Sequence, residues 1–427
     1  MEKVKFSILI VALSLICLNG YTQQPENELN GYLELASANN PALKASFDQY
    51  LAALEKIPQA GSLPDPQATF GYFIKPMELP GGNQLADIQL MQMFPWFGTL
   101  KASKDEASMM AKAKYEAFNA AKAELHFKVK SDWYKLMRSD SEIALVKENI
   151  EILESLEKLV MEKFQSSGLN SSQTGLQDVL RVRMEILEQK NRLALITDQR
   201  RTEETAFNAL LNRKLETQVQ ILDSLVMQPL PAEKSAIADS ILNNSPMLAM
   251  LENETGTYVF MEQKAKKMGL PMLGVGLDYM LIQERQGNTA MMNGNDMFMP
   301  MISVSIPIYR KKYVAMQNEA RLMQEAGTRQ IDDLRNNLMV QYHQLIQSLD
   351  DAERRIDLYK EQEELARSTT DLLLSGYTTT GNDFEDVLRM QIRVLEYGFK
   401  HIEAIADYNT AAAMSEMLTN SINSNTL

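Results

Sequence analysis

The sequence contains one long pattern twice, and the two copies lie about 205 positions apart. The first copy has Asn-Pro-Ala-Leu at 40–43 and Leu-Pro-Asp-Pro at 63–66; the second has Ser-Pro-Met-Leu at 245–248 and Leu-Pro at 270–271. Further on, Asp-Val-Leu-Arg at 178–181 recurs at 386–389. A repeat of this length predicts one body built from two similar halves, rather than a string of independent domains.

Residues 1–22 are predicted to be a secretory signal peptide. Two early lysines precede an apolar run over 6–18 that is too short to span a bilayer, and small residues follow it. Cys17, the single cysteine, lies in this run behind Ile16, whereas lipidation needs a small residue there. We therefore expect ordinary cleavage and a mature chain without cysteine; lipidation of Cys17 is the alternative.

Composition excludes several classes of function. The net charge of −13 argues against nucleic acid as a partner, because phosphate binding needs a basic surface. After the signal peptide, no stretch approaches 18 apolar residues, so the chain can enter a membrane only as β-strands. The three histidines are scattered, and no nucleophilic set can be assembled. We expect no enzyme, no cofactor and no resident metal site.

Each half is predicted to follow one order of elements: helix, β-hairpin, very long helix, tight turn, helix. The first repeat, 23–213, has a helix over 29–60, a hairpin over about 68–94 with a loop near Pro76 and Pro80, and a helix over 99–166. After a break at 166–175, a further helix ends near 213, and a polar linker occupies 214–235. The second repeat, 236–420, has helices over 236–268, 312–374 and 384–420, strands near 272–282 and 299–308, and a turn over 375–383; a tail, 421–427, follows.

The helix over 99–166 contains neither proline nor glycine, which predicts a rod of roughly 100 Å. This length equals that of the two shorter helices of its half placed end to end, so both hairpins should emerge at one end. Part of the rod carries a coiled-coil seam at Ile143, Val146, Ile150, Leu153 and Val160.

Four strands cannot close a barrel, and open sheet edges are not tolerated in lipid. We therefore expect several copies to share one barrel, and three copies would supply twelve strands. The strand pattern is clean at Ile302, Val304 and Ile306. On the first hairpin, Gln92 interrupts a face with Ile88, Leu90 and Phe94.

Taken in order, these motifs resemble the TolC family of outer-membrane efflux proteins. The resembling residues are those at 40–45, 63–66 and 94–98, with the duplicated Asp-Val-Leu-Arg after each predicted glycine turn. The resemblance covers nearly the whole mature chain. It implies a mainly α fold with a small β part: a homotrimer with an α-helical barrel in the periplasm and a shared 12-stranded β-barrel in the outer membrane. It also implies docking on a periplasmic adaptor that links the duct to an inner-membrane pump of the RND type.

The resemblance also implies site residues at the helix tips. Gly168, Leu169, Gly376 and Tyr377 match the turns that adaptors contact, and each glycine would also permit a positive φ in a tight turn. Asp386 matches an acidic ring that closes the periplasmic end, with Arg389 at the next ring position; Asp178 and Asp383 are further candidates. A solvated or intrahelical ion pair is the alternative for the acidic residues.

The predicted second hairpin is rich in methionine, with Met291, Met292, Met297, Met299 and Met301 within eleven residues. Thioether sulfur is a soft ligand suited to Cu(I) or Ag(I), which favours a copper or silver duct similar to the CusC branch. Methionine as flexible apolar filler is the alternative, with drugs as substrates. Two other functions stay open: an exit duct for type I protein secretion, and a periplasmic coiled-coil protein without a pore.

Overall fold

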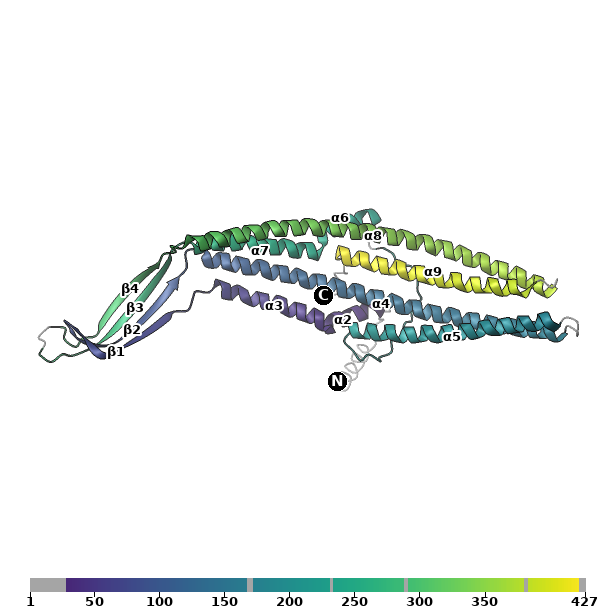
Figure 1. The fold of residues 1–427 in the computed structure, drawn as a ribbon, viewed down its shortest axis with the longest axis horizontal. Coiled ribbons are helices and arrows are strands. Elements are labelled where there is room, and N and C mark those ends of the chain that lie inside the picture. Colours follow the sequence, from purple (N-terminus) through teal and green to yellow (C-terminus); the bar gives the residue numbers. More distant parts are fainter. Residues whose placement is uncertain (1–27, 167–171, 231–232, 288–290, 380–382, 422–427) are drawn as a thin grey trace, which may run out of the picture.

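The computed structural model describes residues 28–166, 172–230, 233–287, 291–379 and 383–421. The molecule is long and narrow, and all four strands lie at one end of the helices (Figure 1). The predicted signal peptide lies outside the described residues, as does most of the predicted tail.

The first half contains α2 (Glu28–Asn39), α3 (Pro41–Gly61), β1 (Gln67–Leu79), β2 (Gly82–Phe94), α4 (Thr99–Ser166) and α5 (Ser172–Leu210). The second half has the same order: α6 (Lys234–Asn244), α7 (Pro246–Met268), β3 (Met272–Gln283), β4 (Met297–Ser305), α8 (Arg310–Thr379) and α9 (Phe384–Thr419). The chain is mainly helical, with four antiparallel strands, as the sequence predicts.

Each predicted first helix is in fact two helices, and this corrects the predictions over 29–60 and 236–268. The breaks fall at Asn40 and Ser245, each followed by a proline at the first helical position. Proline has no N–H to donate, so it begins a helix well and continues one badly. The Asn40 carboxamide oxygen caps α3 by accepting from the N–H groups of Ala42, at 3.0 Å, and Leu43, at 3.1 Å.

Along most of its length the molecule is a single layer of helices and strands, here called the wall. Beside the strands the helices lie in the order α3, α4, α7, α8, and towards the far end in the order α5, α4, α9, α8 (Figure 1). The sheet has the matching order β1, β2, β3, β4. Of the predicted seam, Val146, Ile150, Leu153 and Val160 are buried where α4 packs against its neighbours, and Ile143 is partly buried.

Two strands end at other residues than the sequence predicts. β1 continues to Leu79, although the sequence predicts a loop from Pro76. Pro76 is tolerated because β1 is an edge strand, where one backbone position needs no partner, and the register shifts between Tyr72 and Met77. β4 ends at Ser305, so Ile306 lies beyond the strand.

Within the described part of the chain, no helix has an apolar stretch long enough to cross a membrane.

Candidate functional site

The sheet has two chemically different faces. Residues paired across strands share a face, and Leu90 on β2 pairs with Leu277 on β3, which pairs with Pro300 on β4. The face to which they belong, here called the apolar face, carries Phe70, Tyr72, Ile88, Leu90, Gln92, Phe94, Leu273, Val275, Leu277, Tyr279, Phe298, Pro300, Ile302 and Val304. The opposite face, here called the polar face, carries Thr69, Asp87, Gln89, Asp278, Ser303 and Ser305 among a set of methionines and glycines.

The large side chains of the apolar face are exposed in the single chain. Ile302 is 81% exposed and Phe70 is 69% exposed. Gln92, which interrupts the pattern, turns its amide back to the backbone, donating to the carbonyl of Pro64 at 2.8 Å and to that of Met93 at 3.0 Å. A continuous exposed apolar surface of this kind marks a site of contact with lipid or protein.

At both edges of the wall, the outermost elements have a neighbour on one side only. β1 and β4 each pair with one strand only, so each has a row of backbone groups without a strand partner. At the same edges, α5 and α8 each expose an apolar stripe at helical spacing: Leu176, Leu180, Met184, Leu187 and Leu195 on α5, and Leu322, Val340, Leu358, Leu365 and Leu372 on α8. Each of the two edges therefore offers an exposed apolar surface.

At the end far from the strands, a small core joins the tips of four helices. Leu153 and Val160 of α4, Val182 of α5 and Phe384 of α9 are buried there with Tyr377 of α8. The Lys163 ammonium lies 3.5 Å from the centre of the Tyr377 ring and donates to the Tyr377 carbonyl at 2.6 Å. This pair of contacts connects the ends of α4 and α8, the two longest helices.

The predicted gate residues gather on the surface of this tip. Arg389 lies 3.4 Å from Asp386 and 3.1 Å from Glu385, and all three belong to the first turns of α9. Arg181 connects α5 with α9, because it contacts Asp178 of its own helix at 3.6 Å and Glu385 of α9 at 3.1 Å. Within one chain, the Asp386–Arg389 pair is therefore intrahelical.

The two other predicted gate residues, Asp383 and Asp178, interact with the backbone or are partly buried. Asp383 is the N-cap of α9 and accepts from the Glu385 N–H at 3.0 Å. Burial raises the pKa of Asp178; nearby Arg181 opposes this effect and Asp383 adds to it. Both side chains thus lie next to other charged groups of the tip.

Of the four predicted adaptor-contact residues, the structure describes two, Gly376 and Tyr377. Gly168 and Leu169 lie outside the described residues. Gly376 lies inside α8, which continues to Thr379, so it does not occupy a tight turn and its φ is not positive. The Tyr377 side chain is buried in the tip core. Sequence spacing alone did not reveal the contacts of Lys163, Arg181 and Glu385. These contacts join different helices, so they depend on how the helices pack.

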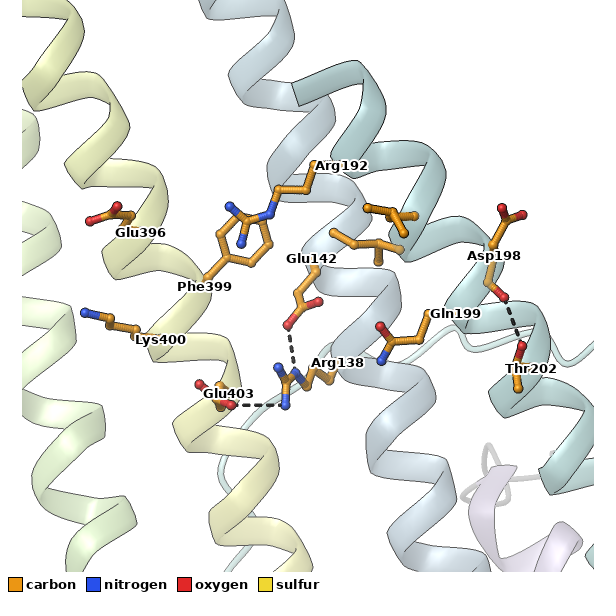
Figure 2. A pocket seen from close by; sticks show the side chains of 12 residues that line it. Arg138, Glu142, Arg192, Asp198, Gln199, Thr202, Glu396, Phe399, Lys400 and Glu403 are labelled. Atoms are coloured by element: carbon orange, nitrogen blue, oxygen red, sulfur yellow. Dashed lines mark hydrogen bonds and ion pairs between the residues drawn. The ribbon is translucent and has the colours of Figure 1, made fainter. Parts of the chain in front are cut away.

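A charged groove of about 860 Å³ lies over α4 between α5 and α9 (Figure 2). In it, Arg138 contacts Glu142 at 2.7 Å and Glu403 at 3.3 Å, and the Arg192 guanidinium lies 3.7 Å from the centre of the Phe399 ring. Acidic and basic side chains line the groove together, so it does not present a single sign of charge. Among the described residues, no three His, Cys, Asp or Glu side chains are grouped to hold a metal ion.

Comparison with solved structures identifies the fold as that of outer-membrane channels. The outer-membrane channel OprN matches with a TM-score of 0.74 at 13% identity, over 92% of this chain and 89% of that one. VceC of Vibrio cholerae matches with 0.73 at 14%, over 92% and 96%, and CusC with 0.69 at 13%, over 92% of each chain. No protein-family model matches the sequence, and no curated protein matches it significantly. The resemblance to the TolC family seen in the sequence is thus a resemblance of fold.

Proposed function

We propose that three copies of this chain form a passive exit duct through the outer membrane. The observation that carries the proposal is the wall one element thick, with an exposed apolar face on its sheet and two unfinished edges. Stable domains bury apolar surface between at least two layers, and the described part of this chain has a single layer along most of its length. In a closed ring of copies, the edges of neighbouring chains would cover one another, so no second layer is needed.

The two edges suit a ring. The α5 stripe of one copy would cover the α8 stripe of the next, while β1 of one copy would pair with β4 of the next. Such a head-to-tail contact between different surfaces closes into a ring when the rotation allows it. Three copies give twelve strands, an even number suited to a transmembrane barrel whose apolar face meets lipid and whose polar face lines the lumen.

The helical part would then extend into the periplasm, with the tip as its inner end. There the duct would dock on a periplasmic adaptor and an inner-membrane RND-type pump, which would supply the energy for export. The tips around Gly168, Leu169, Gly376 and Tyr377 would contact the adaptor, and the charges at Asp178, Asp383, Asp386 and Arg389 would control opening. The outer-membrane channels that share this fold support the duct part of this arrangement.

Fractionation and planar-bilayer recording test the duct. We expect the protein in the outer-membrane fraction of a Gram-negative host, and discrete conductance steps after reconstitution. A protein that stays in the soluble periplasmic fraction and gives no conductance would instead be a coiled-coil spacer. Neighbouring genes separate two kinds of duct: a pump with an adaptor favours efflux, and an ABC exporter favours protein secretion.

A matched pair on β2 tests which face meets lipid. Leu90→Lys places a charge on the apolar face, where it should cost about 2–4 kcal/mol near the bilayer centre and sharply reduce the inserted fraction. Gln89→Lys places the same charge one residue away on the polar face and should leave insertion intact. Equal insertion of the two variants would refute the assignment of faces.

A further inference from the structure

The methionines of the sheet are all on one side. Within the regular register of the four strands, the polar face carries seven: Met91, Met93, Met272, Met280, Met297, Met299 and Met301. Over the same positions, methionine is absent from the apolar face, where the apolar residues are branched, aromatic, alanine or proline. If methionine served only as apolar filler, both faces would use it. Its separation from the other apolar residues points to the sulfur atom.

Two of these sulfur atoms share one polar neighbour. The Ser303 hydroxyl on β4 lies 3.5 Å from Met91 Sδ and 3.7 Å from Met93 Sδ on β2. Both side chains reach across β3 because Gly274 and Gly276 face them there. A Cβ on Gly274 would lie 2.6 Å from Met93 Sδ, and one on Gly276 would lie 3.0 Å from Met91 Sδ. The two glycines thus provide the space in which the thioethers meet.

A third thioether and a carboxylate adjoin this pair. Met301 faces Gly276 from β4, and its sulfur lies 3.8 Å from the Gln89 amide nitrogen. Asp278, in the next row of the polar face, pairs with Gln89 on one side and Met299 on the other. Asp278 is only 8% exposed, and its buried Oδ1 has no hydrogen-bond partner in the described structure. A buried carboxylate oxygen without a partner is costly unless a ligand satisfies it.

We propose that Met91, Met93 and Met301, with Asp278 beside them, bind a soft monovalent cation, Cu(I) or Ag(I). Thioether sulfur prefers these ions to hard cations, and the carboxylate balances the single positive charge. Uncharged drugs would leave Asp278 without a partner. The proposal rests on the proposed function in one respect: in a duct, this site would lie on the lumen wall and make the cation a substrate in passage.

Silver binding to the full-length protein in detergent tests the site. We expect calorimetric titration with Ag(I) alone to show saturable binding, and the variant Met91→Leu/Met93→Leu/Met301→Leu to weaken it by at least about tenfold. Leucine preserves the volume and removes only the sulfur. The matched control is Met227→Leu/Met247→Leu/Met323→Leu, which changes three exposed methionines outside the sheet and should bind silver as the wild type does. Equal losses in the two variants would overturn the proposal.

A second measurement does not depend on the folding of a variant. X-ray absorption at the silver edge of the wild-type complex should show sulfur neighbours. Neighbours that are oxygen or nitrogen alone would overturn the site. Conductance separates the two proposals: channels that conduct but bind silver independently of these methionines refute only the site. A protein that loses silver binding in the Met-to-Leu variant but never conducts refutes only the duct.

Discussion

At the scale of single residues, His126 is a titratable group in the helical part whose pKa the fold lowers strongly. It is buried on α4, and burial followed by the charges of Lys122 and Lys130 lowers its pKa from 6.5 to about 4. The Ser37 hydroxyl donates to the Leu33 carbonyl at 2.8 Å, so it accepts from His126 Nε2, which lies 2.8 Å away. The fold thus holds a neutral imidazole with its proton on Nε2.

The lowered pKa of His126 predicts a loss of stability in acid. Between pH 6.5 and about 4 the unfolded chain binds a proton at this position and the folded chain does not, so stability falls as the pH falls. The contribution is about 3 kcal/mol at most. Denaturant unfolding at pH 7.5 and 4.5 should show a smaller pH dependence in His126→Gln than in the wild type. An identical pH dependence would assign the acid sensitivity to other groups.

Asp386 tests the charges at the tip. In the proposed ring, removing its carboxylate should favour opening, and since an exposed pair contributes about 0.2–1 kcal/mol, basal conductance should rise by a few-fold at most. Asp332→Ala is the matched control, because Asp332 pairs with Arg335 at the same spacing, at 3.8 Å, on α8. A rise in Asp386→Ala alone supports the gate, and unchanged conductance removes Asp386 from it.

At the scale of elements, the two helix breaks look alike in sequence and differ in structure. The Asn40 side chain caps α3 and also donates to the Leu210 carbonyl at 2.9 Å, whereas the Ser245 side chain makes no capping bond to α7. Asn40→Ala should therefore cost about 1–2 kcal/mol of stability, and Ser245→Ala less than about 0.5 kcal/mol. Thermal melting compares them, and equal shifts would contradict the capping account.

The same elements show how far sequence could predict the fold. The helix α4 is predicted to the residue, because 68 residues without proline or glycine leave no place to break it. The breaks before Pro41 and Pro246 were missed because the apolar pattern continues across them, although proline at the first helical position was a usable signal. At the tip, the spacing of Asp386 and Arg389 suggested an ion pair, but the contact of Lys163 with Tyr377 depends on how α4 lies against α8.

At the scale of the whole molecule, the duplicated sequence corresponds to a duplicated order of elements along a one-layer wall. Each half supplies one hairpin, one long helix and shorter helices beside it. The helices α5 and α8 lie at opposite edges (Figure 1), and the apolar stripe on each is exposed in the single chain. In the proposed ring, neighbouring copies would cover these two stripes.

The number of copies is the most direct test of this account. Native mass spectrometry of the protein extracted from membranes in mild detergent measures it. A closed ring formed through the two exposed edges predicts an assembly of three chains. It predicts no larger assemblies that grow by the addition of further chains. A protein that is extracted as a single chain, with the edges of β1, β4, α5 and α8 uncovered, would contradict the account.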